Sequence, residues 1–73
     1  MYFLRIGDDY LEDAMGFKTL KDARAEYRST AQELYRYGQS IEASVHIAPS
    51  IDEVVEYPDY VLSYDGKVIM ESA

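Results

Sequence analysis

The sequence predicts a small α+β domain of two layers, with one main helix packed on a largely antiparallel sheet. Residues 20–37 place apolar side chains at helical spacing, with polar side chains between them. Four other segments have the apolar, β-branched and aromatic composition of strands: 2–7, 41–48, 60–64 and 67–71. The element order is therefore β-α-β-(short α)-β-β. With 73 residues, we expect one domain spanning 1–73.

The first strand is expected over residues 2–7, which end at Gly7. Apolar groups fall on both of its faces, so the strand is predicted to be central in the sheet. Residues 8–16 are expected to form an acidic connection. Within it, residues 10–15 could make one helical turn, which Gly16 closes.

The main helix has recognisable ends. Thr19 is placed to cap its N-terminus, and Asp22 complements the first turn. Gly38 stands where a left-handed residue commonly ends a helix. One face of the helix gathers the residues expected to enter the core, which are Leu20, Ala23, Tyr27, Thr30, Ala31 and Leu34.

The segment 41–48 alternates between apolar and polar residues. Its apolar positions, expected in the core, are Ile41, Ala43, Val45 and Ile47. Its polar positions, expected in solvent, are Glu42, Ser44 and His46. Ser50 and Glu53 then have the spacing of a capping box, which predicts a short helix over 51–56.

The last two strands flank Asp65-Gly66. This dipeptide between two apolar runs predicts a tight hairpin turn with positive φ at both positions. In that register Leu62 lies opposite Ile69, and Val61 lies opposite Met70.

The composition is acidic, with 14 carboxylates, 7 basic residues and a net charge of −7. Nucleic acid and anionic membranes should repel such a chain, so we expect neither as a direct partner. No segment is long enough to span a bilayer. The chain has no cysteine, which fits a reducing compartment, and we expect a cytoplasmic location.

The charge is unevenly distributed. Residues 17–37 carry five basic and three acidic side chains, whereas the rest of the chain carries two basic and eleven acidic ones. The acids of the helix, Asp22, Glu26 and Glu33, fall on one flank of the apolar face. Lys21, Arg24 and Arg28 fall on the other. These edges keep the helix solvated, or one of them is a docking surface.

Two acidic clusters lie on connections between the predicted elements. We call residues 8–13 the first acidic connection; its candidate binding residues are Asp8, Asp9, Tyr10, Glu12 and Asp13. We call residues 52–60 the second acidic connection; its candidates are Asp52, Glu53, Glu56, Tyr57, Asp59 and Tyr60. Carboxylates interleaved with tyrosines suit an arginine-rich protein surface, through ion pairing and cation–π contact. The alternative is that the acids only solubilise the chain and the tyrosines, eight in all, cover a thin core.

Residue patterns for catalysis are sparse. The chain has no cysteine nucleophile and no phosphate-binding glycine loop, and His46 is its one histidine. The first acidic connection could hold a hard cation, but it lacks the alternating ligands and turn glycine of an EF-hand. We therefore expect a protein that is not an enzyme, with no cofactor and no metal site.

A compact, acidic, cysteine-free α+β chain of this size resembles the small proteins encoded by phages and mobile elements, including anti-CRISPR proteins. The resemblance covers size, charge and element order, and it carries over no functional residue. It implies an inhibitor that occupies a basic, nucleic-acid-binding surface of a protein or ribonucleoprotein complex. Carboxylates would then stand in for phosphates as a nucleic-acid mimic.

Two other functions fit the same residues. A structural, self-assembling domain could form a homodimer or larger assembly by pairing the basic helix edge of one copy with an acidic connection of another. A domain that binds a small ligand or a metal is the third hypothesis, and it predicts a melting temperature that rises with the ligand.

Overall fold

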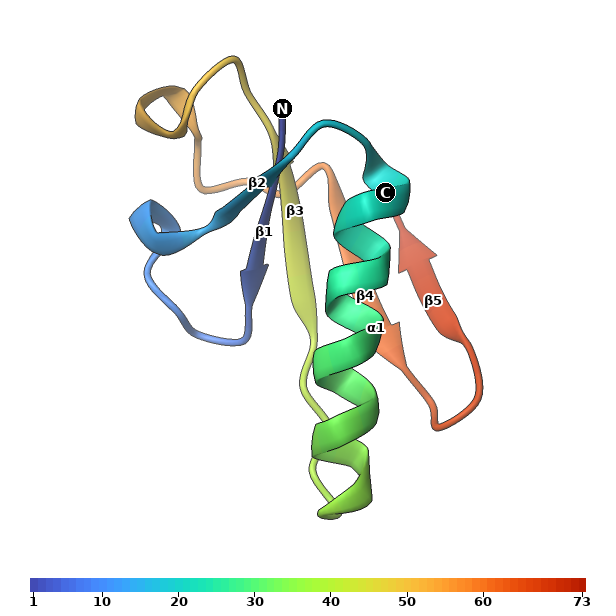
Figure 1. Ribbon diagram of the computed structural model, residues 1–73. Helices are drawn as coiled ribbons and strands as arrows, with labels where there is room; N and C mark the ends of the chain where they lie inside the picture. The colour runs from blue at the N-terminus through green and yellow to red at the C-terminus, as the bar shows by residue number, and fades with distance from the viewer.

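The computed structural model describes residues 1–73 as one helix on a five-stranded antiparallel sheet of order β2-β1-β3-β4-β5 (Figure 1). This architecture confirms the predicted α+β class. The strands are β1 (Tyr2–Ile6), β2 (Met15–Phe17), β3 (Ala43–Ile47), β4 (Tyr60–Tyr64) and β5 (Ile69–Ser72). The helix α1 spans Leu20–Arg36, and two single 3₁₀ turns are η1 (Leu11–Asp13) and η2 (Ile51–Glu53).

Strand β1 has neighbours on both sides, as its apolar faces predicted. One neighbour is β2, so Met15 and Gly16, predicted to belong to a connection, form a strand instead. In β2, Gly16 lies opposite Phe3, and a Cβ on Gly16 would stand 3.1 Å from the Phe3 ring. A glycine weakens the local strand signal, but here it lets the aromatic ring lie against the neighbouring backbone.

Helix α1 begins and ends as predicted. The Thr19 hydroxyl accepts a 3.1 Å hydrogen bond from the Asp22 amide, and Gly38 takes a φ of 75° just beyond the last turn. The expected core face is correct at its centre, where Ala23, Tyr27 and Ala31 are buried. They pack with five residues of the sheet: Leu4, Ala43, Val45, Leu62 and Ile69.

The face of the sheet opposite α1 is covered in part by the segment between β3 and β4. Phe3 and His46 are both buried there, and His46 is only 1% exposed. The prediction of a solvent-facing His46 is therefore wrong, because alternation gives the face of a strand and not what covers that face. Ile47, predicted in the core, is instead exposed at the end of β3.

The segment after Pro49 is less helical than predicted. Only η2 forms, and the Ser50 side chain makes no capping hydrogen bond. Val54 is extended, and the chain then bends at Glu56, Tyr57 and Asp59 before β4 begins. The capping-box spacing was present, but too few residues follow it to propagate a helix.

The β4–β5 hairpin has a different register from the predicted one. Tyr64 lies opposite Ile69, and Leu62 lies opposite Glu71. The turn is centred on Gly66 and Lys67, because the Asp65 carboxylate accepts hydrogen bonds from the amides of Lys67 (2.8 Å) and Val68 (2.9 Å). These bonds hold the pKa of Asp65 below its usual value. The slip is two residues along β5, so Leu62 and Ile69 still share the core face.

Candidate protein-binding site

The first acidic connection joins β1 to β2 through η1. Its side chains at Asp8, Asp9, Tyr10, Glu12 and Asp13 are all exposed, and Tyr10 is 73% exposed. Main-chain bonds from Asp13 to Tyr10 (3.0 Å) and from Ala14 to Leu11 (3.1 Å) fix the turn. None of its four carboxylates forms an ion pair within the chain. Their charge therefore faces solvent.

The second acidic connection joins β3 to β4 and includes most of η2. Asp52, Glu53, Glu56 and Tyr57 are exposed, and Tyr57 is 83% exposed. Glu56 has a weak internal partner, since its Oε1 lies 3.5 Å from Arg5 Nη1. Asp52 and Glu53 have none. This connection thus presents exposed carboxylates and an exposed aromatic ring.

Two of the predicted binding residues also hold the fold together. The Asp59 carboxylate accepts a 2.7 Å hydrogen bond from the Ile47 amide, and the Asp59 amide donates to the Val45 carbonyl oxygen at 2.8 Å. Tyr60 opens β4 and packs against the core. A substitution at either position would therefore test stability together with binding.

The two acidic connections leave the sheet at opposite ends of the β1–β3 ladder. The first follows Ile6, which pairs with Ala43, and the second follows Ile47, which pairs with Tyr2. At the usual rise per residue these ends are about 13 Å apart. In the view of Figure 1 both connections lie to the left of the sheet, away from α1 and β5. A partner that contacts both must present a broad surface.

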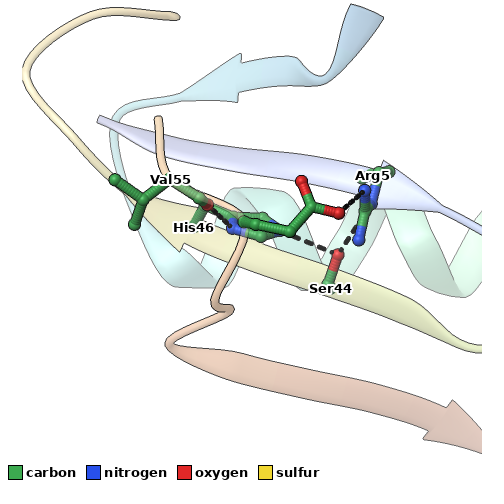
Figure 2. Close-up of polar contacts among 5 residues, drawn as sticks. Arg5, Ser44, His46 and Val55 are labelled. Atoms are coloured by element: carbon green, nitrogen blue, oxygen red, sulfur yellow. Dashed lines mark hydrogen bonds and ion pairs between the residues drawn. The ribbon is translucent and has the colours of Figure 1, made fainter. Parts of the chain in front are cut away.

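A chain of hydrogen bonds lies behind the second acidic connection (Figure 2). His46 Nδ1 lies 2.8 Å from the Val55 carbonyl oxygen, and His46 Nε2 lies 3.0 Å from Ser44 Oγ. Arg5 Nε donates to the same Ser44 oxygen at 3.3 Å. A carbonyl oxygen only accepts, so we assign the proton of a neutral ring to Nδ1. Ser44 then donates to Nε2, so both ring nitrogens of His46 and the Ser44 hydroxyl have hydrogen-bond partners.

This hydrogen-bond chain positions the second acidic connection. It fastens the main chain at Val55 to β3, directly before the exposed Glu56 and Tyr57. The Ser44–His46 distance is also that of a nucleophile and its base. However, His46 is buried, and the one pocket of the structure is lined by α1 and β5 residues. The arrangement therefore offers a substrate no cleft beside Ser44.

The sequence predicted the exposed acids but not the hydrogen bonds that link Arg5, Ser44, His46 and Val55. The available signal was the shared face of Ser44 and His46, two residues apart on one strand. Nothing local places Arg5 beside them or Val55 above them, because these residues come together only when β1 pairs with β3 and the connection folds back.

No three side chains of histidine, aspartate or glutamate lie close enough together to hold a metal ion. Helix α1 lacks the length and apolar content needed to cross a bilayer.

The fold and the exposed acidic connections define a small, acidic, two-layer α+β protein with one helix on a five-stranded antiparallel sheet. No protein-family model, curated protein or solved structure matches the chain. Its function is therefore inferred from its own residues.

Proposed function

We propose that this chain is a protein-binding domain that performs no chemistry and acts by occupying a basic surface of a partner protein or ribonucleoprotein complex. One observation carries the proposal: six carboxylates of the two acidic connections are exposed and form neither an ion pair nor a side-chain hydrogen bond within the chain. They are Asp8, Asp9, Glu12, Asp13, Asp52 and Glu53. Such charges attract lysine and arginine side chains that otherwise hold phosphates.

The tyrosines support the same function. Tyr10 and Tyr57 are the most exposed large hydrophobic side chains of the first and second acidic connections, respectively. An exposed tyrosine offers a large contact area at small entropic cost, and its ring face attracts an arginine guanidinium. A ring beside carboxylates therefore favours an arginine-rich surface over a merely cationic one.

Hydrogen bonds to β3 reduce the conformational entropy that the second acidic connection loses when a partner binds. The Asp59–Ile47 hydrogen bond and the His46–Val55 hydrogen bond hold both ends of the segment that carries Glu56 and Tyr57. A connection already held in one conformation loses little entropy when a partner binds. This arrangement suits an inhibitor that competes with nucleic acid for the same site.

The test uses the tagged chain and three charge-neutralised variants, incubated with lysate of the native host at low and high salt. The first variant changes Asp8, Asp9, Glu12 and Asp13 to their amides. The second changes Asp52, Glu53 and Glu56, and spares Asp59. The matched control changes Asp22, Glu26 and Glu33 on α1, and so removes as much charge as the second variant from another surface.

We expect the parent chain and the control to capture the same partner at low salt and to release it at high salt. Each acidic-connection variant should capture less, and the partner's own nucleic acid should displace the parent chain from the purified partner. Equal capture by all four proteins would overturn the proposal. So would a partner that binds its nucleic acid equally well with and without this chain.

A further inference from the structure

A groove separates the first half of α1 from β5. Its volume is about 390 Å³. Figure 1 shows β5 running beside α1, with the C-terminal end of the strand near the first turns of the helix. Five lining residues come from α1 and one from β5: Leu20, Lys21, Arg24, Ala25, Arg28 and Glu71. Two of these residues, Leu20 and Ala25, are apolar and the other four are charged. The groove lies on a part of the molecule that neither acidic connection reaches.

The charge in this groove is opposite to that of the whole chain. Lys21, Arg24 and Arg28 face a single acid, Glu71, although the chain carries a net charge of −7. Glu71 Oε1 lies 3.4 Å from Arg24 Nε, close enough for an ion pair. That Nε atom is nevertheless buried without a hydrogen-bond partner. Lys21 and Arg28 are exposed and form no ion pair within the chain. The groove therefore has unused capacity for a carboxylate, which the positive end of the α1 dipole also favours.

Strand β5 offers its outer edge beside the groove, because it is the last strand of the sheet. The Asp65 amide donates to the Val68 carbonyl oxygen, and hydrogen-bonded pairs alternate along an antiparallel ladder. Met70 and Ser72 therefore direct their main-chain groups towards β4. Ile69 and Glu71 direct theirs outward, where an added strand would find them.

We propose that this face binds an extended acidic peptide segment of a partner protein, which adds to β5 as a further strand and places carboxylate side chains against Arg24 and Arg28. Alternate side chains of an extended peptide point to one face, so an acid at every second position would meet the groove. Main-chain bonds to Ile69 and Glu71 give the affinity, and the cations give the preference for acids.

A second copy of this chain fits the same edge less well. Antiparallel pairing of two β5 strands would place both α1 helices on the same face of the continuous sheet, on either side of the seam. Lys21, Arg24 and Arg28 of one copy would then line a common channel with the same three residues of the other. Like charges facing one another oppose that dimer, whereas an acidic strand neutralises them.

The probe is a short peptide in which glutamate and valine alternate, added to the isotope-labelled full chain. The control peptide replaces each glutamate with glutamine and so keeps length and strand propensity. Binding is followed by fluorescence anisotropy, by NMR shifts and by amide hydrogen exchange. We expect the acidic peptide to shift residues of α1 and β5 along the groove, and to slow exchange at the Ile69 and Glu71 amides.

The variants separate charge from fold. Arg28→Gln leaves the Arg24–Glu71 ion pair intact and should weaken the acidic peptide about tenfold, the usual effect of one charge-assisted contact. Arg24→Gln should weaken it at least as much. Lys18→Gln and Arg36→Gln, which remove cations outside the groove lining, should leave affinity unchanged.

Equal affinity for the two peptides, or unchanged affinity in both groove variants, would overturn the proposal. If the Ile69 and Glu71 amides are protected from hydrogen exchange without peptide, and this protection rises with protein concentration, the edge binds a second copy of the chain and the peptide proposal is wrong. The acidic-connection variants should bind the peptide as the parent chain does. A negative result in the peptide experiment would therefore overturn the peptide-binding proposal without affecting the function proposed for the acidic connections.

Discussion

The phenolic hydroxyl of Tyr27 donates a 2.6 Å hydrogen bond to the main-chain carbonyl oxygen of Ile41. Tyr27 is fully buried at the centre of the core face of α1, and Ile41 lies between α1 and β3. The bond ties the helix to the segment that returns the chain to the sheet. Burial, together with the negative charge of Glu42, raises the pKa of the Tyr27 phenol.

Replacing this hydroxyl should destabilise the protein without changing its fold. Tyr27→Phe keeps the ring but leaves the Ile41 carbonyl oxygen without its partner, so we expect a loss of about 1–3 kcal/mol in the free energy of unfolding. Urea denaturation monitored by circular dichroism measures it. Tyr37→Phe, at an exposed ring, is the control and should be neutral. A Tyr27→Phe protein as stable as the parent would contradict the role assigned to the bond.

The raised pKa of Tyr27 predicts how stability changes at alkaline pH. The folded state holds the phenolic proton more tightly than the unfolded chain, whose tyrosine titrates near 10.0. This contribution is complete below about pH 10 and is lost as the pH rises through the higher folded pKa. Melting temperatures across that range should fall for the parent chain and fall less for Tyr27→Phe. Parallel curves would show that another group controls alkaline unfolding.

Asp65 should account for part of the stability that the protein loses at acidic pH. Hydrogen bonds from the Val68 and Lys67 amides lower its pKa from 3.8. The contribution is therefore present above pH 3.8 and is lost as the pH falls through the lower folded pKa. Asp65→Asn can still accept both bonds but cannot titrate, so its melting temperature should fall less on acidification. Asp8→Asn, which removes a carboxylate that makes no hydrogen bond, controls for the lost charge. If the melting temperatures of Asp65→Asn and the parent chain fall equally on acidification, Asp65 does not have this role.

Local signals were enough to predict most of the fold. The Thr19 cap, Gly38 and the apolar spacing of α1 act within a few residues of each other, so the helix was predictable to its ends. Strand β2 was not, because three residues around Gly16 form a strand only by pairing with β1. The hairpin register was also missed, because the Asp65 carboxylate moves the turn by one residue.

The candidate site was predictable only in its exposed part. Acids on connections are expected to face solvent, and Asp8 and Glu53 do. The structural bond of Asp59 to Ile47 and the burial of His46 depend on contacts between distant segments, which periodicity does not encode. The same holds for the groove, since Glu71 meets Arg24 only after β5 has taken its place beside α1.

The hydrogen-bond chain at His46 predicts a local effect on the second acidic connection. His46→Phe keeps a ring but removes both nitrogens, which leaves the Val55 carbonyl oxygen and Ser44 without their partner. We expect a loss of about 1–3 kcal/mol in unfolding free energy. We also expect faster cleavage after Glu56 by a glutamate-specific protease, because Val55 is released from β3. Ser44→Ala leaves the Val55 bond intact, so it should not speed that cleavage. Equal cleavage of His46→Phe and the parent would exclude an anchoring role.

Alanine substitutions at two glycines with positive φ, Gly38 and Gly66, distinguish the cost of backbone strain from the cost of side-chain crowding. Gly38 has a φ of 75° and no atom within 4 Å of an added Cβ, so Gly38→Ala should cost only the left-handed strain, about 1–2 kcal/mol. Gly66 has a φ of 97°, and an added Cβ would stand 2.6 Å from the Tyr35 ring. That ring makes an edge-to-face contact with Tyr64, with centroids 5.6 Å apart.

Gly66→Ala should therefore cost more than Gly38→Ala by the value of the Tyr35–Tyr64 contact, about 0.5–1.5 kcal/mol, because the Tyr35 ring must move aside. The measurement is urea denaturation of both variants in the parent chain and again with Tyr35→Ala. In the Tyr35→Ala background the crowding is gone, so the two glycine substitutions should cost similar amounts. If their costs are already equal in the parent chain, Tyr35 moves freely. Its contact with Tyr64 then contributes nothing to the stability of the β4–β5 hairpin.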